Sequence, residues 1–465
     1  MSINKNILKL AIPSILANIT VPLVGMVDIA VAGHLDTNAA TLIGGIAIGS
    51  MLFDLLYWNF GFLRVGTGGL AAQAYGRGDR RECARILTRA LGMSLGIALM
   101  LLMIQWIFVK AAFLVVDCTP QVRDLASEYF YVRIWAAPAT LSLMALKGWF
   151  IGMQDSVSAM VADVTVNGMN ILMSFVLALG LTIGGREIVS GMGFAGIAAG
   201  TVTAQWTGLL ISLLIVAFKY RRNTMSQLTT GDLKELFRGG ETRRFFVMNA
   251  NLFVRSLCFI AIYIGFTIIS ARYGDTLLAV FSIMMKLLMI FSYFTDGFAY
   301  AGEALTGRYV GARDALGLRL TVKWTFVWSM GLAVMFMGIY HFAGVPMLRM
   351  MTSDPTVVDA SRAFLPWLLL MPVVGCAAFT WDGIYIGATA SRQLRDSMIW
   401  AVIAFFSVWF AGIMILSLLY KNGTVAPQRY DGLAMHILMA AYFAHLLART
   451  IYLTAKACKS VFSSI

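Results

Sequence analysis

The chain has 465 residues, of which 59% are hydrophobic and only 13% are charged, and its mean hydropathy is +0.79. A soluble domain averages about 45–50% apolar and about 25% charged residues. This composition excludes a water-soluble globular protein and makes lipid the solvent. Only helices and closed β-barrels satisfy their backbone groups in lipid. Long apolar runs, such as Leu91 to Phe108, favour helices, because barrel strands alternate in polarity.

The net charge of +13 could suggest a nucleic-acid partner. The basic residues, however, form short clusters between the apolar runs, as membrane topology requires. We therefore expect no nucleic-acid partner. The five cysteines and four histidines are dispersed without ligand spacing, so we expect no metal site and no cofactor. No GxxxxGK[ST] motif is present, so the chain does not bind ATP by that device.

The apolar runs predict an all-α integral membrane protein with twelve membrane-spanning helices. Their predicted residue ranges are 7–33, 41–66, 86–110, 124–147, 157–180, 193–218, 245–272, 276–302, 320–344, 359–386, 397–420 and 432–456. Basic clusters follow every second span, and the intervening connections contain few basic residues. By the positive-inside rule both termini are cytoplasmic, which predicts a multi-pass protein of the cell inner membrane.

An internal repeat divides the predicted helices into two sets of six. Thr119-Pro120 resembles Asp354-Pro355, and 355 − 120 = 235. The same offset relates two further pairs of segments, which begin at Gly76 and Gly311 and at Gly148 and Gly383. Six spans separate equivalent positions, so the two halves are parallel repeats, one of the geometries found in secondary transporters. We predict a first lobe at residues 1–220, a cytoplasmic linker at 221–244 and a second lobe at 245–465.

One carboxylate interrupts the first predicted span. Asp28 lies about two-thirds of the way across it, after Pro13 and Pro22. A charge at this depth costs about 2.5–3.5 kcal/mol on insertion scales, so it is a functional candidate by default. Proline removes a backbone hydrogen bond and bends a helix. We interpret Asp28 as a proton or cation site on a bent helix; a structural hydrogen bond to a neighbouring helix is the alternative.

Further polar residues lie within the spans of the first half. Asn167 and Asn170 are three residues apart and so share one helix face. Their amides could hold a carboxylate or a cation, or could join two helices. Asp54 lies near the middle of the second span and is equally open to both interpretations.

The second half has a different set of ionisable residues. Arg255 lies on the seventh span, while Lys286 and Asp296 lie on the eighth. We predict an ion pair between Arg255 and Asp296, because they fall at similar depth on adjacent helices. Lys286 is deep and has no evident partner in the sequence. Asp382 is interpreted as a turn or cap residue at the end of the tenth span.

These residues together resemble the MATE (multidrug and toxic compound extrusion) family, and its DinF-like branch most of all. The resemblance rests on the segment FLRVGTGGLAAQAYG, which begins at Phe62, on Pro13 and Asp28 in the first span, and on DGFA and DGIYIG in the second half. It covers essentially the whole chain. It implies a V-shaped pair of six-helix lobes with alternating access, and export of small amphipathic or cationic organic compounds. We expect the protein to be a monomer whose surroundings are the lipid bilayer.

The resemblance also implies roles for particular residues. Asp28 is the ion-coupling carboxylate, and Asn170 is its polar neighbour. Family members often carry an acid four residues after that asparagine, where this chain has Ser174. This departure favours protons over sodium as the coupling ion. The alternatives are a sodium-coupled drug antiporter, a lipid-linked oligosaccharide flippase, which would favour a strongly basic cavity, and a membrane enzyme, for which no catalytic cluster is visible.

Overall fold

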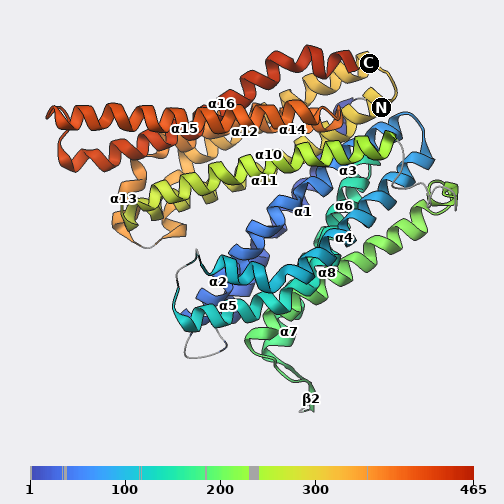
Figure 1. The fold of residues 1–465 in the computed structure, drawn as a ribbon, viewed down its shortest axis with the longest axis horizontal. Helices are drawn as coiled ribbons and strands as arrows, with labels where there is room; N and C mark the ends of the chain where they lie inside the picture. Colours follow the sequence, from blue (N-terminus) through green and yellow to red (C-terminus); the bar gives the residue numbers. More distant parts are fainter. Residues whose placement is uncertain are drawn as a thin grey trace. The chain divides into compact units, whose positions relative to one another are not determined.

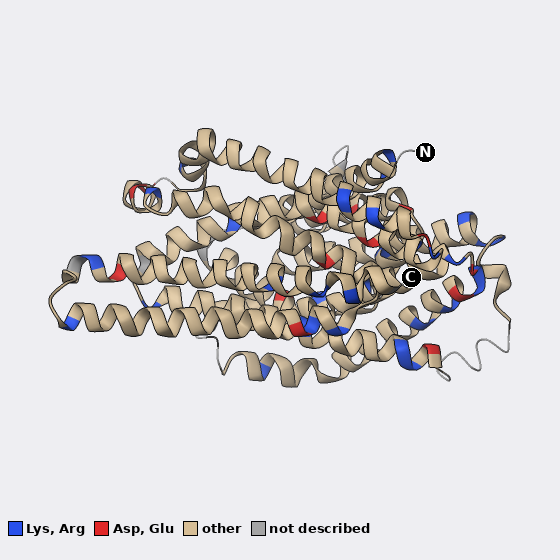
Figure 2. Ribbon diagram, turned by 90° about the horizontal axis from the view of Figure 1, so that it is seen from above, with Lys and Arg blue, Asp and Glu red and all other residues tan. Residues whose placement is uncertain are grey.

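The computed structural model describes residues 3–33, 35, 39–114, 116, 118–183, 186–229, 240–352 and 354–464. Residues 230–239 of the predicted linker lie outside this set. Twelve helices in the described part of the chain are long and apolar enough to cross a membrane, which confirms the predicted number. Lys, Arg, Asp and Glu lie mostly near the helix ends, and the central parts of the helices are largely uncharged (Figure 2).

Two of the first six spans are each interrupted by a 3-10 turn; the helices of these spans, α1 to α8, are labelled in Figure 1. Their elements are α1 (Ile3–Gly33), α2 (Ala39–Trp58), η1 (Asn59–Gly61), α3 (Phe62–Gly76), α4 (Arg80–Ala112), α5 (Pro120–Arg133), η2 (Ile134–Ala136), α6 (Ala137–Gly152), α7 (Ser156–Leu179) and α8 (Phe194–Ile215). The π-helical turn η3 (Val216–Tyr220) and the 3-10 turn η4 (Met225–Gln227) follow α8.

The last six spans are longer than the sequence predicts at almost every end, because several helices extend beyond their apolar cores into polar residues. Their elements are α10 (Gly240–Ala271), α11 (Asp275–Gly311), α12 (Ala315–Met351), α13 (Pro355–Arg362), α14 (Leu365–Gly387), α15 (Ser391–Lys421), α16 (Pro427–Ser460) and the 3-10 turn η5 (Phe462–Ser464).

A short β-hairpin, which the sequence analysis did not predict, joins α7 to α8. The strands β1 (Leu181–Ile183) and β2 (Arg186–Val189) pair antiparallel, with an irregularity after Leu181. The hairpin extends beyond the end of α7 (Figure 1). Strands this short carry too little alternation of polarity to be separated from a loop in the sequence.

The chain forms two compact units. The first unit comprises Ile12–Val247, and the second comprises Met248–Ile465 together with the first residues of the chain, up to Ala11. In the first unit α7 packs along α8 and α3 along α6; in the second α15 packs along α16 and α11 along α14. Two helices, α1 and α10, therefore belong to one unit at their start and to the other unit for the rest of their length.

The offset of 235 residues recurs in the local structure of the helix starts. Asp79 caps α4 by accepting a hydrogen bond from the backbone N–H of Glu82 at 2.9 Å. Asp314 caps α12 in the same way, accepting from the N–H of Gly317 at 2.8 Å. Such a cap satisfies one of the four N–H groups that lack a partner at a helix start. The shared sequence pattern thus encodes the same helix start in both halves.

The same offset also recurs where two helices of one unit approach each other most closely. A Cβ atom placed on Gly148 of α6 would lie 2.1 Å from the carbonyl oxygen of Arg64 on α3. A Cβ on Gly383 of α14 would lie 2.1 Å from the carbonyl oxygen of Ala299 on α11. Arg64 and Ala299 are themselves 235 residues apart. Only glycine, which has no side chain, permits such an approach of two backbones.

One helix start differs between the halves. Asp155 caps α7 through the N–H of Ser158 at 3.2 Å, and it also accepts hydrogen bonds from Lys219 at 2.7 Å and Tyr220 at 2.6 Å. The corresponding residue of α15, Ala390, has no side-chain cap. Burial would raise the pKa of Asp155, but hydrogen bonds from Lys219, Ser158 and Tyr220 outweigh burial and lower the pKa of this carboxyl from its ordinary value of 3.8.

Asp155→Asn is expected to lower the melting temperature of the purified protein at about pH 7, since hydrogen bonds to a charged group contribute about 2 kcal/mol. Because the folded-state pKa is depressed, this contribution is complete above the ordinary pKa and is lost as the pH falls through the folded pKa. Melting curves of both proteins should therefore converge in acid. Asp354→Asn, at a fully exposed cap, is the control; a difference that persists in strong acid would show that the charge of Asp155 has no part in stability.

Candidate functional site

Asp28 lies in the interior of the first unit. Its side chain is 5% exposed. The helix that carries it, α1, is continuous and contains both Pro13 and Pro22. Ser174 on α7 donates a hydrogen bond from Oγ to Asp28 Oδ1 at 3.0 Å. Pro22 has no N–H to offer to the carbonyl one turn earlier, which weakens α1 just before Asp28. The carboxylate thus occupies a locally weakened part of a membrane helix and contacts a neighbouring helix.

The polar residues of α7 form a row along one face. Asn167, Asn170 and Ser174 are three or four residues apart, which places them on adjacent turns. Asn167 Nδ2 donates to Thr20 Oγ1 on α1 at 2.5 Å, and Asn170 Nδ2 donates to Thr201 Oγ1 on α8 at 2.9 Å. The Oδ1 atom of Asn170 is buried and accepts no hydrogen bond within the described part of the chain. An unused hydrogen-bond acceptor, Asn170 Oδ1, therefore lies one helical turn from Ser174, which binds Asp28.

A cation that the sequence analysis missed acts on this site. Arg133 ends α5, and the charge of its guanidinium acts on the Asp28 carboxylate. Its guanidinium donates to Tyr129 Oη at 3.0 Å and lies 4.8 Å from the ring centroid of Phe53. Asp54, which the sequence placed with the polar site, has an exposed side chain on α2, and its charge also acts on Arg133.

In the second unit the predicted pair of Arg255 and Asp296 is wrong. Arg255 Nη2 instead contacts Asp382 Oδ2 at 2.5 Å, and Arg449 Nη2 on α16 contacts the same oxygen at 2.5 Å. Asp382 is therefore not a turn or cap residue but the shared acceptor of two arginines inside α14. Asp296 is half-buried on α11 with interactions of its own.

The wrong partner has a physical explanation. Arg255 and Asp296 lie at similar depth on helices that are adjacent in the chain, whereas α10, α14 and α16 meet only through tertiary packing. Arg449 is 0% exposed, and the only signal for it was a basic residue inside the last apolar run. Lys286, the third predicted residue of this half, has an exposed side chain on α11.

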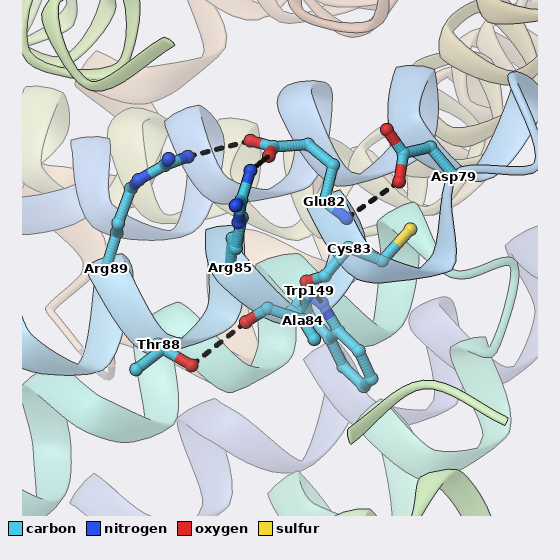
Figure 3. Close-up of polar contacts among 8 residues, drawn as sticks. All are labelled: Asp79, Glu82, Cys83, Ala84, Arg85, Thr88, Arg89 and Trp149. Atoms are coloured by element: carbon cyan, nitrogen blue, oxygen red, sulfur yellow. Dashed lines mark hydrogen bonds and ion pairs between the residues drawn. The ribbon is translucent and has the colours of Figure 1, made fainter. Parts of the chain in front are cut away.

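A separate polar cluster lies at the start of α4 (Figure 3). Glu82 accepts a hydrogen bond from Arg89 Nη1 at 2.7 Å, and Arg85 lies 3.8 Å from its other oxygen. Trp149 on α6 donates from Nε1 to the carbonyl of Cys83 at 2.8 Å. These contacts hold the start of α4 together and join it to α6. Glu82 and Arg89 also line a small pocket with residues of α3 and α10.

Among the described residues no group of three or more His, Cys, Asp or Glu side chains is arranged to hold a metal ion. The buried Asp28 carboxylate in one unit, and Asp382 with its two arginines in the other, are polar features that lie inside the membrane-spanning helices.

Comparison with known proteins decides the family. A model of the MatE family matches residues 13–176 and again residues 252–416. The chain belongs to the MatE family. Over 406 residues this MATE protein is 33% identical to DNA damage-inducible protein F of Escherichia coli, covering 87% of this chain and 85% of that protein. This agrees with the DinF-like branch that the sequence motifs indicate. Like its relatives, the chain is a transporter and not an enzyme.

More distant relatives and solved structures agree with this placement. "Probable multidrug resistance protein NorM" of Photorhabdus laumondii is 24% identical, covering 88% of this chain and 86% of that protein. A solved structure described as the outward-facing conformation of a multidrug resistance MATE family transporter has a TM-score of 0.79 at 16% identity, and the match covers 98% of this chain and 97% of that one. The chain thus has the MATE fold.

Proposed function

We propose that this MATE protein is a proton-driven antiporter that exports small amphipathic or cationic organic compounds, and that Asp28 is the residue that couples the two movements. The observation that carries the proposal is the buried Asp28 carboxylate, which accepts a hydrogen bond from Ser174 at 3.0 Å inside a membrane helix. An ionisable residue within a membrane span marks an ion or substrate pathway by default. The relatives named for multidrug resistance support the class of substrate.

The surroundings of Asp28 favour a proton over a sodium ion. In its charged form the carboxylate accepts from Ser174; when protonated it gains a donor, so the local hydrogen-bond pattern changes direction. A sodium ion would need several oxygen ligands without a nearby positive charge. Here the position that often holds a second acid in the family is Ser174, and the Arg133 guanidinium acts on the carboxylate. Arg133 opposes the binding of any cation, a proton included, so the preference for a proton rests on the missing second acid.

Coupling follows if proton binding and substrate release each favour one arrangement of α1 over another, since a ligand shifts an equilibrium only by its differential affinity.

We further propose that the protein works as a monomer in the cell inner membrane, with both termini in the cytoplasm. Proteolysis or labelling of a C-terminal tag in everted and right-side-out vesicles tests this orientation; access from the outer face would contradict it.

Transport into everted membrane vesicles tests the coupling ion. The probe is ethidium, a lipophilic cationic dye, and proton and sodium gradients are imposed separately. We expect the dye to accumulate with an imposed proton gradient, to be released when a protonophore collapses that gradient, and to be indifferent to sodium. Accumulation that follows only the sodium gradient would replace the proton by sodium, and no accumulation with either gradient would contradict antiport of a cationic dye.

A further inference from the structure

Lys286 places a positive charge in the middle of a membrane span. It lies on α11, 286 − 276 = 10 residues after the start of the predicted span 276–302, which is about 15 Å along the helix. The hydrocarbon core of a bilayer is about 30 Å thick, so this position is near its centre. Lysines reach the membrane surface from positions near helix ends, and Lys286 is too deep for this.

The side chain of Lys286 is exposed. Within the described part of the chain it makes neither a hydrogen bond nor an ion pair. Charged residues inside membrane spans almost always pair with one another or face water, because contact with lipid tails is costly. An exposed lysine without a partner at this depth therefore indicates water beside α11.

The face of α11 that carries Lys286 is polar along its length. Its residues recur at alternating spacings of four and three, which keeps them on one side of the helix. They are Ser282, Lys286, Met289, Tyr293, Asp296 and Tyr300. All six side chains are exposed or half-buried. Hydroxyl groups, an ammonium group and a carboxylate on one face are suited to water and not to lipid tails.

An exposed face of α4 provides the contrast within the same protein. Its residues Leu95, Leu99, Met103 and Trp106 share one side of the helix, and each is more than half exposed. All four are large and apolar or aromatic, as contact with hydrocarbon requires. The polar face of α11 does not follow this pattern, although it is also exposed.

The equivalent face of the first half is exposed as well. At the offset of 235 residues the first four residues of the α11 face correspond to four residues of α2, which are Ala47, Met51, Asp54 and Trp58. All four are exposed. Each half thus presents the same helix face with one charge in its middle, negative at Asp54 and positive at Lys286. The charge of Asp54 acts on Arg133, whereas Lys286 has no ion pair among the described residues.

We propose that Lys286 lies on a water-filled substrate pathway and binds the acidic group of amphipathic organic compounds, with Met289 and Tyr293 beside their apolar bodies. A carboxylate or sulfonate supplies the acceptor that the ammonium group lacks. Methionine adapts to irregular shapes, and tyrosine adds broad apolar contact. The proposal adds zwitterionic and acidic compounds to the substrates proposed above. It rests on that transport activity, but on neither Asp28 nor the coupling ion.

Water accessibility is the first test. Lys286→Cys is treated with a membrane-impermeant methanethiosulfonate in right-side-out and in everted vesicles. The reagent attacks as a thiolate forms, so it modifies a thiol in water and not one in lipid. The protein is then denatured, and a gel shift with a maleimide polymer counts the thiols that stayed free. The wild type, with five native cysteines, gives the reference count.

We expect the added thiol of Lys286→Cys to be blocked in at least one vesicle orientation. Leu99→Cys is the control, because it lies on the apolar face of α4 at a similar depth, 110 − 99 = 11 residues from the end of the predicted span 86–110. Its thiol should stay free. A thiol of Lys286→Cys that stays free in both orientations would place this residue in lipid and would overturn the proposal.

The charge of the ligand is the second test. Rhodamine B has a free carboxylate, and its ethyl ester has the same aromatic body without one. Binding of both dyes to the purified full chain is measured by equilibrium dialysis against matched detergent. Lys286→Gln should weaken binding of the acid about tenfold and leave binding of the ester within about twofold. Lys286→Arg, which keeps the charge, should retain most of the affinity for the acid.

Met51→Gln, at the equivalent exposed position of α2, is the matched control and should leave the ratio of the two affinities unchanged. An equal loss for acid and ester in Lys286→Gln, or no loss for the acid, would overturn the proposal. Binding to the purified chain needs no ion gradient. Failure of the proton mechanism and failure of this proposal therefore give different results.

Discussion

Asp28→Asn is expected to reduce proton-driven dye accumulation to the level of vesicles that lack the protein. Asparagine has nearly the shape of protonated aspartate and can still take part in a hydrogen bond with Ser174, but it cannot exchange a proton. The side chain is 5% exposed, and an uncharged amide is less costly than a carboxylate within a membrane span. The variant should therefore fold with an unchanged melting temperature, and the loss should lie in transport alone.

Two further substitutions separate charge from contact. Asp28→Glu keeps a titratable carboxyl group and should retain part of the accumulation. Ser174→Ala removes only the hydrogen bond at 3.0 Å, a loss of about 1 kcal/mol, and should reduce accumulation no more than a few-fold. Normal accumulation by Asp28→Asn under a proton gradient would make Asp28 a structural residue and would end the proposed mechanism.

Gly148→Ala and Gly383→Ala are each expected to destabilise the protein by about 3 kcal/mol or more, at the upper end of the cost of overpacking. In both positions the added methyl group would lie 2.1 Å from a backbone carbonyl oxygen. A carbonyl that belongs to a helix backbone cannot rotate away as a side chain can, so the two helices must separate. We expect little monodisperse protein after purification and a lower melting temperature.

Matched glycines provide the controls. A Cβ atom on Gly96 of α4 or Gly331 of α12 has no neighbour within 4 Å. Alanine is favoured over glycine in a helix by about 1 kcal/mol, so Gly96→Ala and Gly331→Ala should be neutral or slightly stabilising. If all four variants had the same yield and melting temperature, the close approach of the helices would not govern stability.

The repeat and the spans were predictable because each depends on local sequence. An apolar run of about 20 residues can only be satisfied as a helix in lipid. The motifs at Asp79 and Gly148 recur in the second half because both halves contain the same helix start and the same close approach of two helices. The β-hairpin between α7 and α8 was missed because it is too short to show a periodicity.

The ionic contacts of the site were less predictable than its residues. Asp28 and Arg255 were found because a charge within an apolar run is conspicuous. Ser174 was singled out only through the family resemblance, as the position that lacks an acid. Arg449 was not found as a partner of Asp382, since it lies almost 200 residues from Arg255 in the chain. Which residues of two helices contact each other depends on the rotation of each helix about its own axis, and an error in that rotation changes the partner.

The course of α1 has a mechanical consequence. This helix passes from one compact unit to the other between Ala11 and Ile12, and Pro13 follows immediately, so its backbone lacks a hydrogen bond to Lys9 at that boundary. In α10 the boundary lies between Val247 and Met248, and no proline occurs anywhere in the helix. Of the two helices that join the units, α1 is therefore easier to bend at the boundary than α10. Pro22 lies between this boundary and Asp28, so α1 has two points at which a backbone hydrogen bond is missing, whereas α10 contains no proline.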